Sequence, residues 1–146
     1  MKKMILVAMM AFVAFSAMAQ DAKPVTVEAV GSNSGFGLSA GYVFSLNTMS
    51  LEPNLAAIYG SDFGGQVGVR YYPFSAVGMG AYTELSYGLI PATPYSLHNF
   101  LGLVGYRFNF LKVMTAHVGI GGTYYNLNSD VYAFDFGLNV GLGFRF

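Results

Sequence analysis

Residues that could do chemistry are few in this chain of 146 amino acids, because only 10% of them are charged. There is no cysteine, so neither a disulfide framework nor a thiolate metal site is possible. The charged residues recur at equivalent positions in stretches of alternating polarity. We expect eight ionisable side chains to share one face and to form a network of paired charges: Glu28, Glu52, Arg70, Glu84, Arg107, His117, Asp135 and Arg145.

A serine and a histidine two positions apart, Ser96 and His98, form a second candidate site. Such a pair could act as nucleophile and base in the hydrolysis of a lipid. No acidic residue is placed nearby to orient the imidazole, as a catalytic triad requires. The other histidine, His117, has no second ligand at metal-binding spacing on its face. We therefore expect no enzymatic activity, no metal site and no cofactor, and retain the Ser96–His98 pair as an alternative.

The alternation that positions the charged residues is clearest in residues 132–146. Every even position there, from Tyr132 to Phe146, is apolar or aromatic, and every odd position is small or polar. Successive side chains of an extended strand point to opposite faces, so a period of two predicts a β-strand and excludes a helix. Seven earlier stretches show related alternation, and their charged residues fall on the side that is rich in glycine and small polar residues.

The composition favours a membrane protein. Apolar residues make up 54% of the chain, whereas globular domains have about 45–50% apolar and about 25% charged residues. After residue 19 no apolar run reaches the length of about 20 residues that a helical span needs. Since backbone groups find no partners in hydrocarbon, strands cross a membrane only as a closed barrel. We predict an all-β fold, an eight-stranded antiparallel up-and-down transmembrane β-barrel with apolar side chains toward lipid and charges in the lumen.

Details of the strands follow from the turn residues. Pro53 lies on the outward face of the third strand and cannot donate to the ladder, so we expect a bulge or kink there. The register of the first strand is left open. We expect short connections at 47–48, 73–76 and 111–112 at the end of the barrel that holds both termini, and connections at 31–35, 60–64, 90–97 and 126–130 at the outer end.

Residues 1–19 have the pattern of a cleaved signal peptide. Lys2 and Lys3 precede a short apolar run, which ends in the small-residue sequence Ala17-Met18-Ala19. Residues 20–146 then form one domain. Without the two lysines, five basic residues face seven acidic ones, and this balance argues against a nucleic-acid partner.

The chain resembles the small eight-stranded outer-membrane barrels of the OmpA and OmpX type. The resemblance covers nearly all of residues 20–146 and depends on hairpins such as Val67-Gly68-Val69-Arg70-Tyr71-Tyr72-Pro73-Phe74 and on the terminal Gly143-Phe144-Arg145-Phe146. It implies location in the outer membrane, contact with outer-membrane lipid including lipopolysaccharide, and insertion by the outer-membrane assembly machinery with periplasmic chaperones. It also implies that Phe144 and Phe146 act as the assembly signal.

Three functions are compatible with these patterns. The first is a structural or envelope-interaction role, with a lumen plugged by side chains, because eight strands enclose a space just wide enough for side chains. The second is a narrow passive pore for ions or small solutes. The third is a lipid-modifying hydrolase that uses the Ser96–His98 pair at the rim. A soluble periplasmic carrier would need the aromatic faces inward, and this would leave charges outside among exposed glycines.

Overall fold

A computed structural model describes residues 25–33, 35–60, 62–91, 96–109, 113–128 and 131–146. The predicted signal peptide lies outside these residues. In the described parts there is no helix long and apolar enough to span a membrane. The strands are β1 (Val25–Ser32), β2 (Gly35–Tyr42), β3 (Phe44–Leu46), β4 (Met49–Tyr59), β5 (Phe63–Tyr72), β6 (Gly80–Ile90), β7 (Leu97–Asn109), β8 (Met114–Asn128) and β9 (Val131–Arg145).

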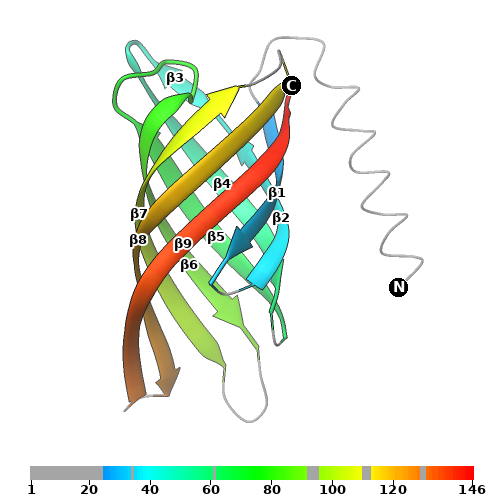
Figure 1. The fold of residues 1–146 in the computed structure, drawn as a ribbon, viewed down its shortest axis with the longest axis vertical. Helices are drawn as coiled ribbons and strands as arrows, with labels where there is room; N and C mark the ends of the chain where they lie inside the picture. The colour runs from blue at the N-terminus through cyan, green and yellow to red at the C-terminus, as the bar shows by residue number, and fades with distance from the viewer. Residues whose placement is uncertain (1–24, 34, 61, 92–95, 110–112, 129–130) are drawn as a thin grey trace, which may run out of the picture.

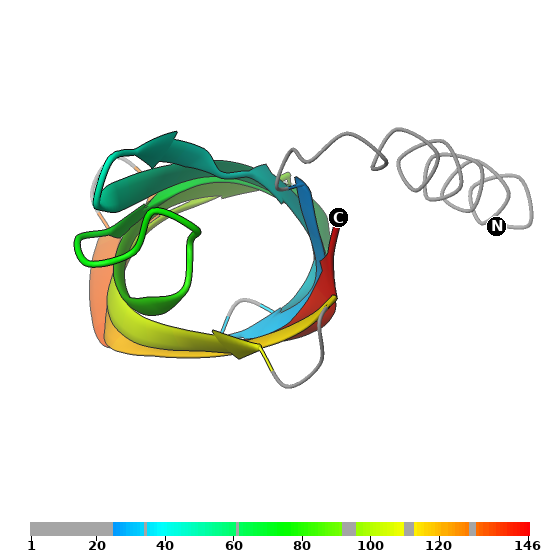
Figure 2. The ribbon, with the colours of Figure 1, turned by 90° about the horizontal axis from the view of Figure 1, so that it is seen from above.

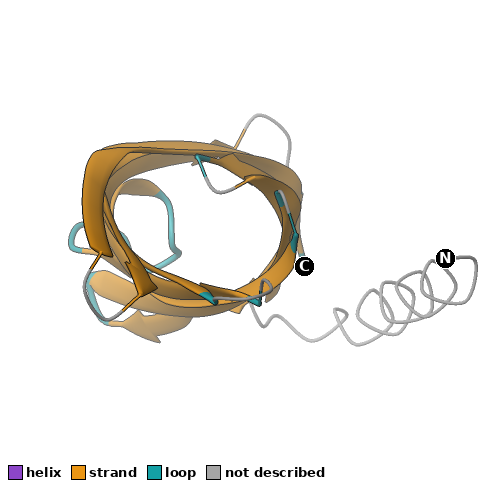
Figure 3. Ribbon diagram, turned by 90° about the horizontal axis from the view of Figure 1, so that it is seen from below, coloured by secondary structure: helices purple, strands orange, loops and turns teal. Residues whose placement is uncertain are grey.

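The strands form one closed antiparallel barrel. Apart from β2 and β3, strands that are neighbours in the chain pair with each other, and β1 also pairs with β9, which closes the ring (Figures 1 and 2). β2 and β3 both pair with β4 and are separated only by Val43, so together they act as one strand. Seen from the opposite end, the wall of the ring is formed by strands, and the loops lie at its ends (Figure 3). The predicted eight-stranded up-and-down barrel is therefore confirmed.

The expected bulge at Pro53 is absent. β4 pairs with β5 in one continuous register through Pro53. On its other edge the ladder runs to Gly41 opposite Asn54 and resumes at Phe44 opposite Leu51, with the same number of residues on both strands. The interruption lies where the missing N–H of Pro53 would have donated. The proline thus breaks the ladder locally without shifting the register, and the alternation continues through this strand.

The β5–β6 connection is longer than expected, because it spans residues 73–79 rather than 73–76. Side-chain hydroxyls hold it in place. The Ser75 hydroxyl accepts hydrogen bonds from two amides of the turn, and the Ser50 hydroxyl donates to the Ser75 carbonyl at 2.6 Å. Gly78 has a positive φ of 65° and donates its amide to the Ser50 hydroxyl at 3.0 Å. These bonds keep residues 77–79 out of the strand.

The two ends of the barrel differ. We call the end that holds Val25 and Phe146 the terminal end; the β3–β4 and β5–β6 connections lie there too (Figure 1). The opposite end is the far end. The strands that meet at the far end differ in length: β8 and β9 each have 15 residues, whereas β1 has 8. Near this end the β8–β9 ladder has a register shift between Asn126 and Asn128. The predicted connection at 111–112 lies outside the described residues.

The two faces of the sheet are as predicted. Outward positions carry large apolar side chains that stay exposed, such as Leu85 (75%) and Phe134 (77%). Inward positions are buried although many are polar. The open register of the first strand is also settled, because Thr26 and Glu28 are buried while Ala29 is exposed. The barrel therefore has a polar interior and an apolar exterior.

Candidate functional site

Six of the eight predicted ionisable residues meet inside the barrel, and none of the six is more than 3% exposed. The strand register brings them together. Arg70 on β5 lies directly opposite Glu52 on β4 and Glu84 on β6. Arg107 on β7 lies opposite His117 on β8. We call this set the lumen cluster: Glu28, Glu52, Arg70, Glu84, Arg107 and His117.

Arg70 joins carboxylates from three strands. Its Nη1 lies 2.7 Å from Oε2 of Glu28 and 3.8 Å from Oε1 of Glu52, and its Nε lies 2.8 Å from Oε2 of Glu84. Its guanidinium also stands over the ring of Tyr82, 5.6 Å from the centroid. One buried side chain thus links β1, β4, β5 and β6 across the lumen.

Arg107 makes a second, parallel set of contacts. Its Nη1 lies 2.6 Å from Oε2 of Glu52, and its Nη2 lies 2.8 Å from Oε1 of Glu28. Two hydroxyls complete the surroundings of Glu52, because Thr26 donates to Oε1 at 2.6 Å and Tyr72 donates to Oε2 at 2.7 Å. Every carboxylate oxygen of Glu28 and Glu52 therefore has a partner, which a buried charge requires.

His117 lies at the edge of the lumen cluster. Its Nδ1 is 3.3 Å from Oε1 of Glu28, and its Nε2 is 3.1 Å from Oδ1 of Asn139 and 3.4 Å from Nη2 of Arg70. Nε2 therefore has polar partners, whereas the buried Nδ1 lies near the Glu28 carboxylate without a hydrogen bond. In the described part of the chain, no group of three or more His, Cys, Asp or Glu side chains could hold a metal ion.

Glycines make room for the large lumen side chains. A Cβ at Gly105 would lie 2.5 Å from Cζ of Tyr82, and a Cβ at Gly119 would lie 2.8 Å from the hydroxyl oxygen of the same tyrosine. A Cβ at Gly141 would collide with the imidazole of His117. Small and large residues thus face each other across the lumen, as narrow barrels require.

The half of the lumen toward the far end is filled differently. Apolar side chains point inward there, and all of them are buried: Val30, Ile58, Ile90, Leu101 and Leu103. Between this apolar layer and the lumen cluster lies a cavity of about 10 Å³, bordered by Asn54, Arg70 and Glu84. A cavity of that size holds about one water molecule. An ionic layer and an apolar layer thus fill successive parts of the interior.

Asp135 and Arg145 do not join the lumen cluster, although both have the predicted parity. Among the described residues, no ion pair includes either of them. Asp135 is exposed and accepts a hydrogen bond from the Phe136 amide at 2.7 Å. It lies beyond Asn139, where the pairing of β9 with β1 ends, so its inward side is open to solvent. Arg145 is half-buried at the terminal end of β9.

Ser96 and His98 are not joined either. Nδ1 of His98 lies 2.6 Å from the Tyr87 hydroxyl on the outer face, and Ser96 is exposed at the far end. The hydrogen bonds of the described residues include none between Ser96 and His98. The serine–histidine spacing therefore does not produce a nucleophile–base contact in this conformation.

Sequence reasoning did not assign roles to two tyrosines that matter here. Tyr72 donates to Glu52, and its ring lies beneath Arg107, with 5.6 Å between the guanidinium carbon and the ring centroid. Tyr82 lies beneath Arg70 in the same way. Both have even numbers on strands where even positions point inward, and this parity was the signal that could have identified them.

Comparisons with known proteins add little to this geometry. No protein-family model matches the chain. No curated protein matches it. The crystal structure of the N-terminal β-barrel domain of Pseudomonas aeruginosa OprF is similar, with a TM-score of 0.49 and 19% identity, over 84% of this chain and 97% of that one. At this level of similarity the function has to be argued from the chain itself.

Proposed function

We propose that the protein is a bacterial outer-membrane β-barrel with a structural or envelope-interaction role and a lumen closed by side chains. One observation carries the proposal: the exterior is apolar while the interior holds five buried charged side chains and His117. In water this arrangement would expose large apolar surface over the whole circumference, which soluble monomers avoid. In hydrocarbon it is the favourable one.

The dimensions of the apolar exterior fit a membrane. Met49 and Tyr59 are ten residue steps apart along β4, and at about 3.3 Å per step and a tilt of about 40° the strand spans about 25 Å. Outer-membrane barrels have an apolar band of about 25 Å between aromatic girdles. Outward tyrosines lie near both limits here, with Tyr59 and Tyr124 toward the far end and Tyr42 and Tyr106 toward the terminal end.

The filled lumen supports a structural role over a pore. An ion would have to pass both the lumen cluster and the apolar layer, and the cavity between them is water-sized. The proposal includes no catalysis, because the His98 imidazole is paired with Tyr87 rather than with Ser96. It includes outer-membrane lipid as the surroundings, and the assembly machinery as a partner that reads the terminal Phe144 and Phe146, whose rings stack at 6.5 Å.

Cell fractionation combined with a heat-modifiability gel tests this function. We expect the protein in the outer-membrane fraction, and an unheated sample that migrates differently from a boiled one because the barrel stays closed in detergent. Recovery in the soluble periplasmic fraction, with no heat-dependent shift, would contradict it. In planar bilayers we expect no conductance from the wild type or from Arg70→Ala. Steady channel openings would favour the pore, and a lipid deacylation abolished by Ser96→Ala would favour the hydrolase.

A further inference from the structure

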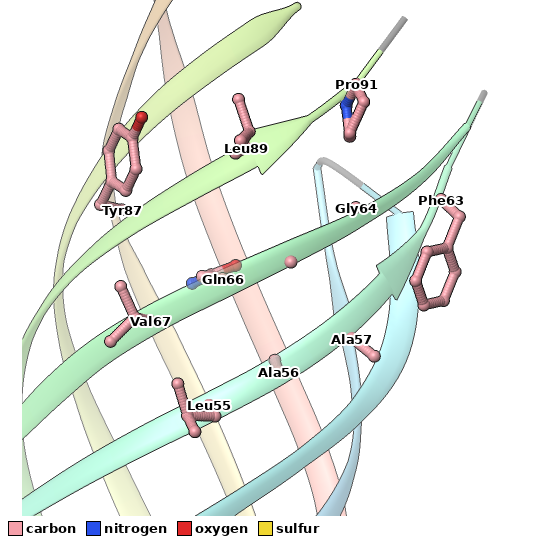
Figure 4. A pocket seen from close by; sticks show the side chains of 11 residues that line it. Leu55, Ala56, Ala57, Phe63, Gly64, Gln66, Val67, Tyr87, Leu89 and Pro91 are labelled. Carbon is pink, nitrogen blue, oxygen red and sulfur yellow. The ribbon is translucent and has the colours of Figure 1, made fainter.

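An open groove on the outside of the barrel and a small cavity in its lumen share one part of the wall. The groove, of about 510 Å³, crosses the outer face of β4, β5 and β6 and is lined mainly by apolar residues (Figure 4). The cavity, of about 10 Å³, is bordered by the same cross-strand pair, Ala56 and Gln66. The apolar groove has nothing that distinguishes one hydrocarbon from another, whereas the lining of the cavity can specify its occupant.

Polar side chains dominate the lining of the cavity. Seven of the ten residues that border it carry hydroxyl, amide or charged side chains, among them Asn54, Glu84 and Asn139. Cavities that stay empty in proteins are apolar, whereas polar ones hold ordered water that bonds to otherwise unsatisfied groups. The volume admits about one water molecule. The lining must therefore offer hydrogen-bonding groups that the protein leaves unused.

One such group is a donor. Nδ2 of Asn54 is buried and has no hydrogen-bond partner in the described part of the chain. The residue is only 5% exposed, so bulk water does not satisfy this amide. A buried donor without a partner destabilises the fold, and such groups in native structures commonly bond to ordered water. The occupant of the cavity must therefore be able to accept a hydrogen bond.

The other group is an acceptor. Oε2 of Glu84 accepts from Nε of Arg70 at 2.8 Å, but the hydrogen bonds and ion pairs of the described residues include none to Oε1 of Glu84. Both oxygens of Glu28 and of Glu52 are bonded, by contrast. Glu84 is 2% exposed, and a buried carboxylate requires such partners. The occupant must therefore be able to donate as well.

The charges at the cavity argue against an ion. A cation would lie beside the guanidinium of Arg70 and could not accept a hydrogen bond from Asn54. An anion would lie beside the carboxylate of Glu84. A single water molecule is uncharged, has the right size, and both accepts and donates.

We propose that the cavity is a binding site for one water molecule, which accepts a hydrogen bond from Nδ2 of Asn54 and donates one to Oε1 of Glu84. The water joins β4 to β6 across β5 and supplies the partner that the third carboxylate of the lumen cluster lacks. The proposal goes beyond the proposed function and does not depend on it, because the site lies inside the barrel whatever surrounds the exterior.

Crystal structures of the purified barrel in detergent test the site. One crystal is grown in a sodium salt and a second in a rubidium salt, which reveals a bound monovalent cation by its anomalous scattering. We expect one peak of density within hydrogen-bond distance of Asn54 and Glu84, with no anomalous signal. In solution, nuclear magnetic resonance should show cross-relaxation between water and the side-chain amide protons of Asn54.

Two variants and a matched control locate the water. Ala56→Val should remove the density, because Ala56 borders the cavity and two added methyl groups fill a space of one water molecule. Asn54→Leu should also remove it, because leucine offers no donor. The control Ala57→Val makes the same exchange at the next residue, which is exposed and does not border the cavity, and it should keep the water. A heat-modifiability gel checks that each variant is folded.

Three results would overturn the proposal: an empty cavity in the wild type, an anomalous peak at the site, or density that survives both Ala56→Val and Asn54→Leu. A continuous file of waters through the lumen would overturn it too, because the site would no longer hold a single molecule, and that result would also count against a closed lumen.

Discussion

Replacing Arg70 by methionine removes the charge that links three strands of the lumen while keeping most of the side-chain length. In the wild type, Glu28, Glu52 and Glu84 face two guanidinium groups. After the change they face only that of Arg107. Glu84 loses the ion pair it makes at 2.8 Å. The variant therefore leaves buried carboxylates without compensation.

The size of the effect follows from that loss. Removing one partner of a buried ion pair costs about 3–5 kcal/mol. With a urea dependence of about 2 kcal/mol per molar, the unfolding midpoint should fall by roughly 1.5–2.5 M. The assay is urea unfolding in phospholipid vesicles, followed on the heat-modifiability gel.

The matched control is Arg145→Met, since Arg145 is half-buried and outside the lumen cluster. Its effect on the free energy of unfolding should stay within about 1 kcal/mol. The double variant Arg70→Met, Glu84→Gln should lose less than the sum of its single changes, because it removes one of the excess carboxylates. If Arg70→Met shifts the midpoint no more than Arg145→Met, the interior is open to water and the reasoning fails.

Further substitutions test the two faces of the wall. Gly105→Ala should lower the urea midpoint, because the new Cβ would meet the Tyr82 ring and the Val118 carbonyl at 2.5 Å. Gly65→Ala should leave the midpoint unchanged or raise it, because its Cβ would meet nothing nearer than 3.9 Å. Equal losses in the two variants would contradict the packing described for the lumen. Val104→Arg, on the exposed face of β7, should cost about 2–4 kcal/mol as a cation in the lipid-facing band. The control Phe74→Arg changes a side chain of the β5–β6 turn that is 88% exposed, and it should cost little. A similar penalty at both sites would argue against a membrane-facing exterior.

The fold was predictable because each strand repeats the same simple constraint. A period of two assigns every side chain to one of two faces, and the charged residues of all strands fell on the same face. Closure followed from the need to satisfy every backbone group. Even the position of Pro53 did not disturb this pattern, since a missing N–H interrupts a ladder without adding a residue.

The site was predictable only in part, because parity says which face a residue occupies but not how far along the barrel it lies. Asp135 has the correct parity but lies beyond the end of β1, where the inner face meets solvent. The turn at 73–79 depends on the Ser50 hydroxyl, which is distant in sequence from it. Contacts across the lumen, such as that between Arg107 and Glu28, depend on the register of strands that are not neighbours.

Spin labels along β9 test most directly whether the apolar side of each strand faces hydrocarbon. The chain has no native cysteine, so single cysteines can be introduced at successive positions from Phe136 to Phe144 and labelled in vesicles. We expect labels at even positions to collide with dissolved oxygen and to be shielded from a water-soluble paramagnetic reagent, and labels at odd positions to be immobile and shielded from both. Even positions that the water-soluble reagent reaches freely, with oxygen-accessible odd ones, would contradict the proposed orientation.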